Sequence, residues 1–344
     1  MYLGGPNAFL DAHHGEEGRT PGEAVGYRVV AAIVANALQI AFVLGLSPLL
    51  RGVLNRLEER LQAKRGPRIW QPYADLRKLC HKAETVGDEA SWIMRVAPYV
   101  YFASPIIVTL LIPALTAFPL FMAFMGDMVA AGFILGVGGF FLALAAMDAS
   151  NLYGPLGASR TRMVSTLVEP IFVVVFFAVS LTANSTIPYV VQAHWVSSPT
   201  AFFAPSHLLI VAAFLMIIIA ETGRIPVDNP SGHFELAMID ESKLLDFSGR
   251  SLALLKWGGY AKFMVLSLVW LNVLIAPWGL ATDASPLALL SAVVWVSLKL
   301  LGLVVVIAAI EVSLAKLRLY RIQEFLGAAF VTAVLALLVQ PFHQ

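Results

Sequence analysis

The clearest indication of the fold class is PLALLSAVVWVSLKLLGLVVVIAAI at residues 286–310, where Lys299 is the single charged side chain. A helix needs about 20 predominantly apolar residues to cross the hydrocarbon core of a bilayer. The chain contains eight such stretches, at residues 27–50, 97–118, 128–147, 163–183, 204–221, 257–280, 286–310 and 322–341. We therefore predict an all-α, multi-pass membrane protein with about eight transmembrane helices.

The composition narrows the possible functions. The 344 residues are 59% hydrophobic and 13% charged, whereas soluble domains carry about 25% charged residues. Cys80 is the one cysteine, which excludes a disulfide framework and an iron–sulfur cluster held by this chain alone. The chain lacks a Gly-x-x-x-x-Gly-Lys phosphate loop, so it is not itself an ATP-driven pump, and its net charge of +1 does not indicate nucleic-acid binding.

Basic residues are distributed unevenly among the connections between the predicted spans. Of 23 Lys and Arg residues, 19 lie near 51–96, 148–162, 222–256 and 311–321, and none lies in 119–127, 184–203 or 281–285. Cytoplasmic connections carry an excess of Lys and Arg. We therefore predict that the four basic connections face the cytoplasm and that both termini lie on the other side of the inner (plasma) membrane.

The two long basic connections, 51–96 and 222–256, mix apolar side chains such as Trp70 with their charges. This mixture is typical of a docking surface or of an amphipathic element at the membrane surface. The predicted organisation is a non-cytoplasmic segment at 1–24, followed by one eight-helix domain at 25–344 that contains both structured loops.

On the opposite side, residues 186–196 (TIPYVVQAHWV) have the pattern of a short interfacial segment. Aromatic side chains are enriched where the bilayer meets water. We expect Tyr189 and Trp195 to lie at the depth of the lipid headgroups.

Ionisable residues fall within or at the end of three predicted spans: Glu169, Glu221 and Lys299. A charge at mid-membrane costs about 2.5–3.5 kcal/mol on insertion scales, so such residues are functional candidates by default. A desolvated carboxyl group can take up and release protons near neutral pH. We predict that these side chains take part in proton movement.

The segment that leaves the fifth predicted span, ETGRIPVDNPSGHFEL at residues 221–236, concentrates charges and turn residues. Pro226 and Pro230 prevent a continuous helix. Arg224 and Asp228 are spaced to form an ion pair. A rigid turn followed by a solvated helix is the simpler interpretation of the same pattern.

Three motifs follow one another along the chain. They are Arg65-Gly66-Pro67 with Gln71-Pro72-Tyr-Ala-Asp75 and Lys78; Gly157-Ala-Ser-Arg160 with Glu169; and Glu221-Thr-x-Arg224-x-Pro226-x-Asp228 with Glu235-Leu236. In this order, and with matching spans, they resemble the eight-span membrane subunit that anchors the peripheral arm of respiratory complex I, called subunit 1 or H. The resemblance covers nearly the whole chain from about residue 25.

Two departures from complex I point to a different branch of this family. The first loop lacks several residues that the quinone-reducing enzymes have between Gly-Pro and Gln-Pro, and Ser231 and His233 stand where complex I has two further glutamates. Both features are similar to the membrane anchors of group 4 nickel–iron hydrogenases, which include formate hydrogenlyase subunit 4. The loss of two acids argues against the proton-entry chain and the ubiquinone site of complex I.

The resemblance implies that this chain holds no redox centre, no metal and no catalytic residue. It implies docking of a nickel–iron large subunit and a small subunit with a [4Fe–4S] cluster, beside antiporter-like membrane subunits. Their electron transfer would be coupled to proton or sodium movement. The proton-coupling candidates are Arg160, Glu169, Glu221, Arg224, Asp228, Glu235 and Lys299, and the docking candidates are Arg65, Gly66, Pro67, Gln71, Pro72, Asp75, Lys78 and His233.

Three alternatives stay open at this point. The first is a quinone-linked anchor of the complex I type. The second is a stand-alone secondary transporter, although the sequence shows no inverted repeat of the kind that such transporters contain. The third is a passive scaffold whose acidic residues only hold partner subunits.

Overall fold

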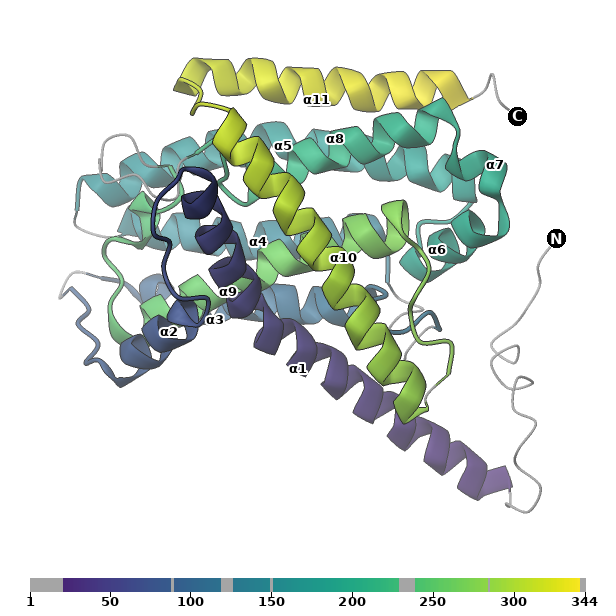
Figure 1. Cartoon of the computed structure of the whole chain (residues 1–344). Coiled ribbons are helices and arrows are strands. Elements are labelled where there is room, and N and C mark those ends of the chain that lie inside the picture. Colours follow the sequence, from purple (N-terminus) through teal and green to yellow (C-terminus); the bar gives the residue numbers. More distant parts are fainter. Residues whose placement is uncertain are drawn as a thin grey trace.

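The computed structural model describes residues 21–87, 90–118, 126–148, 151–228, 239–283 and 285–340, with side chains from Ile33 onward. The described residues form helices and no sheet, apart from an isolated bridge between Thr116 and Ala281 (Figure 1). The elements are α1 (Pro21–Leu61), α2 (Gln71–His81), α3 (Trp92–Leu111), α4 (Met128–Asp148), α5 (Tyr153–Ala183), α6 (Pro188–Ser197), α7 (Pro199–Phe202), α8 (Pro205–Glu221), η3 (Ser242–Leu244), α9 (Gly249–Leu268), η4 (Val269–Ile275), α10 (Pro286–Ser313) and α11 (Leu319–Val339).

The predicted fold class is confirmed. Within the described residues, seven helices are long and apolar enough to cross a membrane. The shorter apolar helix α8 corresponds to the fifth predicted span. The first predicted span differs most from the structure, because α1 continues as a helix to Leu61. The charges that we placed at the start of the first loop, such as Arg51 and Arg56, therefore lie on the last turns of α1.

Helix α9 lies at the centre of the bundle. Helix α9 and the π-helical η4 form one continuous stretch, Gly249–Ile275. In its most apolar 18-residue window 78% of the residues are buried, against 28% in the corresponding window of α11. α9 packs against α1, α2 and α3, whereas α11 covers α5 and α8 (Figure 1). The outer helices leave large apolar side chains exposed, among them Leu287 on α10 and Leu338 on α11. In a membrane, such surfaces face lipid or neighbouring subunits.

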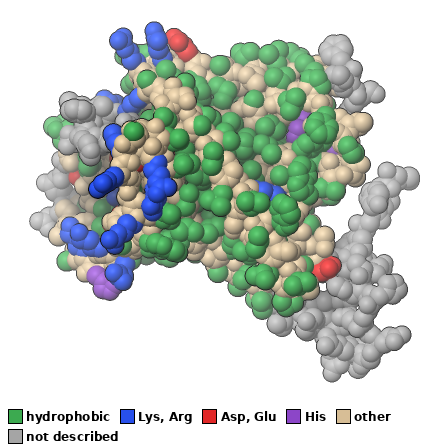
Figure 2. Space-filling model, in the orientation of Figure 1, with side chains coloured by type: hydrophobic (Ala, Val, Ile, Leu, Met, Phe, Trp, Pro, Cys, Tyr) green, Lys and Arg blue, Asp and Glu red, His purple; other side chains and the backbone are tan. Residues whose placement is uncertain are grey.

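The two ends of the bundle differ in charge. Helix α2, η3 and the connections between α4 and α5 and between α10 and α11 lie at one end, which we call the basic end; α6 and α7 lie at the other (Figure 1). Figure 2 shows Lys and Arg side chains gathered at the basic end, while hydrophobic side chains cover most of the remaining visible surface. This arrangement matches the distribution that we used to predict orientation. The side of the membrane that each end faces stays a prediction, as does the segment 1–24, of which residues 1–20 lie outside the described part.

The interfacial segment that we predicted near residue 190 is a helix, α6, but its aromatic residues do not lie at the surface. Tyr189 and Trp195 are 4% and 2% exposed. The Tyr189 hydroxyl donates a hydrogen bond of 3.1 Å to the Ile112 carbonyl, which links α6 to the end of α3. Tertiary packing therefore buries both side chains, and their depth in the membrane stays a prediction.

Candidate functional site

Three of the functional candidates, Glu221, Arg224 and Asp228, lie where α8 ends beside α9 at the basic end. Glu221 is the last residue of α8, and its carboxylate accepts a hydrogen bond of 2.5 Å from the ammonium of Lys262 on α9. Both side chains are largely buried, with 17% and 13% of their surface exposed. A pair of this kind balances two charges that the apolar surroundings would otherwise disfavour.

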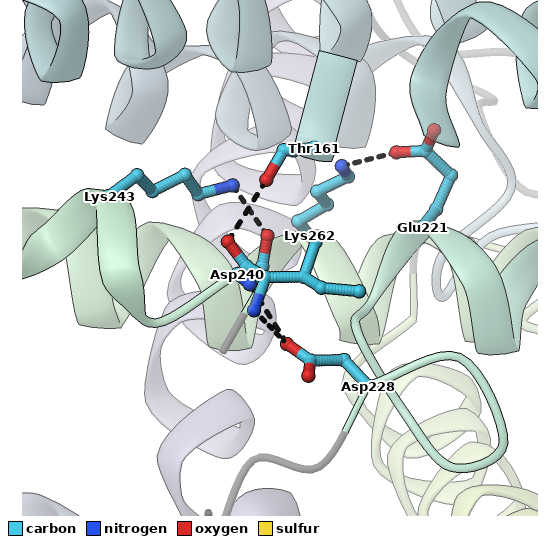
Figure 3. A network of polar contacts seen from close by, with 7 residues as sticks. Thr161, Glu221, Asp228, Asp240, Lys243 and Lys262 are labelled. Carbon is cyan, nitrogen blue, oxygen red and sulfur yellow. Dashed lines mark hydrogen bonds and ion pairs between the residues drawn. The ribbon is translucent and has the colours of Figure 1, made fainter. Parts of the chain in front are cut away.

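A second ion pair lies beside the first. The Lys243 ammonium on η3 lies 2.5 Å from the Asp240 carboxylate (Figure 3). Desolvation acts to raise the pKa of Asp240, but the charge and hydrogen bond of Lys243, together with the charges of Lys262 and Arg51, hold that pKa below its usual value. Desolvation acts to lower the pKa of Lys243, but Asp240, through its charge and its hydrogen bond, and Tyr101 together raise the pKa of the ammonium above its usual value. Both groups are therefore charged at neutral pH.

Asp228 joins this network from the segment after α8. Its Oδ2 accepts hydrogen bonds from the backbone N–H groups of Ile239 (3.1 Å) and Asp240 (2.8 Å) (Figure 3). Its Oδ1 lies 2.7 Å from the Lys316 ammonium in the connection between α10 and α11. The Thr161 hydroxyl on α5 donates to the Ile239 carbonyl at 3.2 Å. Elements that are far apart in sequence therefore converge on this one loop.

Arg224 does not pair with Asp228 as we expected from the spacing. Its Nη1 lies 3.2 Å from Glu311 at the end of α10 and 3.5 Å from Glu58 at the end of α1. The guanidinium carbon also lies 4.4 Å from the centre of the Phe263 ring. Burial lowers the pKa of Arg224 to about 10, so the group stays cationic at neutral pH.

A cavity of about 290 Å³ reaches the two ion pairs from the side of the bundle. Helices α4 and α5 supply its outer wall, which includes Phe133, Phe140 and Glu169, and its lining also includes Glu221 and Lys262. Phe133 and Phe140 are 55% and 45% exposed, so the mouth of the cavity opens on the outer surface of α4. The volume has room for several water molecules, and the charged groups supply the polar partners that ordered water needs.

Glu169 lies at the middle of α5, because this helix begins earlier than we predicted. Its carboxylate lies 3.6 Å from Arg162, and the two side chains are 43% and 31% exposed. The motif partner that we named, Arg160, lies on the same helix and is half-buried. The structure therefore places Glu169 on the cavity wall, while Glu221 and Lys262 lie at its inner end.

Lys299 belongs to a different part of the molecule. Its ammonium donates to the Asn272 side chain at 3.3 Å and to the Ala276 carbonyl at 2.7 Å, and it also contacts the Trp278 carbonyl. Asn272 lies ten residues after Lys262 along α9 and η4, a separation of ~15 Å at the rise of a helix. Ala276 and Trp278 lie farther along the chain, beyond the end of η4. Lys299 therefore satisfies carbonyl groups where η4 ends and is not part of the cluster at the basic end.

The docking candidates of the first loop lie on and before α2. Arg65, Gln71, Asp75 and Lys78 are exposed, whereas Pro72 is buried in the first turn. The Gln71 amide donates to the Asp75 carboxylate at 2.9 Å, one helical turn apart. Gly66 and Pro67 precede the helix, with Gly66 packed closely against α1. The exposed face continues through Arg77, His81 and Lys82. His233 and Glu235, the remaining candidates, lie outside the described residues.

Six contributors to this site are absent from the candidates that we named from the sequence: Glu58, Asp240, Lys243, Lys262, Glu311 and Lys316. Glu58 lies among several charged residues that we assigned to the first loop, because we expected the first helix to end near residue 50. Lys316 was counted only as a loop charge, and nothing in its sequence surroundings indicates its contact with Asp228. Among the described residues, no group of three or more His, Cys, Asp or Glu side chains is placed to hold a metal ion.

The fold and this buried cluster define a polytopic membrane subunit with an ionisable network beneath a charged surface. Residues 29–341 match the NADH dehydrogenase family. Hydrogenase-4 component C of Escherichia coli (strain K12) is 31% identical over 90% of this chain and 95% of its own length. Formate hydrogenlyase subunit 4 of the same strain is 30% identical over 87% of this chain and 95% of its own length. The chain therefore belongs to the NADH dehydrogenase family, which is the family of complex I subunit 1.

Two further similarities agree with this assignment. The H-type subunit of the NADH-quinone oxidoreductase of Rhodospirillum centenum (strain ATCC 51521 / SW) is 23% identical over 81% of each chain. A chain of the membrane-bound sulfane sulfur reductase, an archaeal respiratory membrane complex, has the same fold, with a TM-score of 0.76 and 16% identity over 89% of this chain and 98% of its own length. The predicted resemblance to the complex I subunit 1 family and to the membrane anchors of its hydrogenase branch is confirmed.

Proposed function

We propose that this chain is the membrane anchor of a multisubunit, energy-converting hydrogenase of the formate hydrogenlyase type. It docks peripheral redox subunits on its basic end and couples their electron transfer to proton or sodium translocation. The observation that carries the proposal is the buried network of Glu221, Lys262, Asp240, Lys243 and Asp228, which lies directly beneath the basic end. The hydrogenase-4 and formate hydrogenlyase relatives support the class of complex.

The partners follow from this proposal. A nickel–iron large subunit and a small subunit with a [4Fe–4S] cluster would bind the loops at the basic end, and antiporter-like subunits would lie beside the helices in the membrane. The exposed basic face of α2 and the exposed apolar faces of the outer helices supply surfaces of the required chemistry. In this assembly the basic end faces the cytoplasm, and the termini lie on the opposite side of the inner membrane.

The energy required is within reach of a carboxylate network. Moving a proton against about 150 mV costs about 3.5 kcal/mol. A change of about two to three units in the pKa of one carboxyl group supplies that amount, at 1.36 kcal/mol per unit. A shift of Asp228 and Asp240, driven by the docked subunits, would alter the field at Glu221 and Lys262.

The test uses Glu221→Gln in the assembled complex, reconstituted in vesicles. We expect proton translocation to fall strongly while hydrogen evolution from the artificial donor reduced methyl viologen continues. Because Glu221→Gln leaves the Lys262 ammonium buried without its partner, the double variant Glu221→Gln/Lys262→Met provides a form without a buried unpaired charge. The matched control is Glu324→Gln, which removes an exposed carboxylate from α11.

The outcomes separate the alternatives. Normal translocation by assembled Glu221→Gln and double variants would contradict the coupling role. If the variants reduce the amount of assembled complex, but the complex that does assemble still couples normally, the passive scaffold is favoured. Turnover blocked by a quinone-site inhibitor favours the complex I type, and transport by the purified chain alone in liposomes favours a secondary transporter.

A further inference from the structure

A pair of carboxyl groups at the basic end shares one guanidinium. Glu58 at the end of α1 and Glu311 at the end of α10 both approach Nη1 of Arg224, at 3.5 and 3.2 Å. The exposed fractions of the three side chains are 16% for Glu58, 4% for Glu311 and 2% for Arg224. Three segments of the chain therefore meet in one buried polar site.

The charges of this site do not balance if both carboxyl groups are ionised. Two carboxylates and one guanidinium leave a net negative charge in a nearly dry environment, which is strongly unfavourable. Among the described atoms, Glu58 Oε1 and Glu311 Oε2 are buried and have no hydrogen-bond partner. One proton on either carboxyl group would make the site neutral and allow an O–H···O bond between the two groups.

Other charged groups lie near the site but do not replace this proton. Arg51 on α1 acts on Glu58 and on Arg224, yet it is half-buried and, within the described part of the chain, forms no ion pair with Glu58 or Glu311. A second cavity of about 100 Å³ is lined by Arg224 but not by Glu58 or Glu311. The remaining charged groups around that cavity are Arg51, Glu221, Asp228, Asp240, Glu241, Lys243, Lys256 and Lys262. On α9, the Phe263 ring covers the guanidinium.

We infer that Glu58 and Glu311 form a proton-binding site that holds one proton between them beside Arg224, separate from the Glu221–Lys262 pair. When the site releases its proton, one carboxyl O–H bond breaks, the proton passes to water at the partly exposed Glu58 side chain, and the site becomes anionic. The added negative charge strengthens the electrostatic attraction between the carboxylates and the Arg224 guanidinium. It thereby fixes the start of the segment that follows α8 more firmly. This inference deepens the proposed function and rests on it for its role in the complex.

The test is infrared difference spectroscopy on the purified complex at neutral pH. We expect the C=O stretching band of a protonated carboxyl group in the wild type, with the shift that deuteration of a carboxyl group produces. Glu58→Gln and Glu311→Gln should each abolish that band. In either variant the remaining carboxylate pairs fully with Arg224 and has no reason to hold a proton.

A matched control and a double variant complete the design. Glu59→Gln, at the neighbouring half-buried position, should leave the band unchanged. Each single variant keeps one negative charge beside Arg224 and should assemble, whereas Glu58→Gln/Glu311→Gln leaves the guanidinium buried without a partner and should lose assembled complex. Assembly of the double variant at the wild-type level would contradict the charge balance that underlies the site.

The inference is overturned if the spectra of the wild type and both single variants are the same in the carboxyl region. It is also overturned if the band disappears in only one single variant, because the two carboxyl groups then do not share a proton. Neither outcome depends on translocation. If the band behaves as expected but Glu221→Gln translocates normally, the site stands and the proposed coupling role of Glu221 fails.

Discussion

At the scale of single residues, Asp228 shows how one carboxylate organises the basic end. Its two oxygens bind the backbone of Ile239 and Asp240 on one side and the Lys316 ammonium on the other. The residue is 1% exposed, so water does not compete for these contacts. Hydrogen bonds to a charged group contribute about 1.5–3 kcal/mol each when they are well formed.

We predict that Asp228→Asn lowers the stability of the complex by roughly 1.5–3 kcal/mol, because the amide is uncharged and offers one acceptor oxygen in place of two. Thermal unfolding in detergent, followed by tryptophan fluorescence, measures the change. The matched control is Glu324→Gln, which removes an exposed carboxylate from α11 and should cost less, about 0–1 kcal/mol. Equal losses in both variants would mean that the contacts of the buried Asp228 carboxylate contribute little.

At the scale of elements, the contact between α1 and the start of α2 shapes the proposed docking face. A Cβ atom at Gly52 would lie 1.9 Å from the Ile69 carbonyl oxygen and 3.2 Å from the Pro72 ring. The chain before α2 therefore lies directly on α1, and Tyr73 donates a hydrogen bond to the Gly45 carbonyl. This close approach requires glycine at position 52.

We predict that Gly52→Ala displaces the start of α2 from α1, at a cost of roughly 1–3 kcal/mol, since backbone atoms must move to admit the methyl group. Limited digestion with trypsin, quantified by mass spectrometry, should show faster cleavage after Arg77 and Lys78. Gly45→Ala is the matched control, because nothing lies within 4 Å of the added Cβ. Equal cleavage rates in both variants would show that α2 does not depend on this contact.

At the scale of the whole molecule, charge and apolar surface are separated. The basic end carries the exposed face of α2, while the sides of the bundle expose apolar side chains from α4, α5, α10 and α11. Such a molecule has one surface for charged partners outside the membrane and another for lipid or membrane subunits. Cys80 lies exposed on α2 and therefore reports on whether that face is covered.

We predict that Arg77→Glu/Lys78→Glu weakens binding of the peripheral subunits by roughly tenfold, about 1.4 kcal/mol, and reduces its dependence on salt. The measurement is rebinding of these subunits to stripped membranes at several salt concentrations. Arg318→Glu/Arg321→Glu is the control with the same charge change elsewhere on the basic end. Equal weakening by both pairs would indicate a general charge effect.

We also predict that alkylation of Cys80, quantified by mass spectrometry of its peptide, is slower in the assembled complex than in stripped membranes. A docked subunit limits access of the reagent to this exposed thiol. The same rate in both preparations would place the docking surface elsewhere on the basic end.

The membrane class, nearly all of the spans and the separation of charge between the two ends follow from the sequence alone. Length and hydropathy suffice for the spans, because the bilayer imposes them on each helix independently, and the distribution of Lys and Arg among the connections suffices for the separation of charge. The sequence also located Glu221, Arg224 and Asp228, since charges at the exit of a span are costly wherever they occur.

Which charged side chains form ion pairs with one another depends instead on tertiary packing. Arg224 pairs with Glu58 and Glu311 from the ends of α1 and α10, and Asp228 with Lys316, although simple spacing favoured a pair between Arg224 and Asp228. Packing also separates Lys299 from the network and buries Tyr189 and Trp195. Such contacts join helices that are distant in sequence, so they are set by how the bundle assembles and leave no periodic signal along the chain.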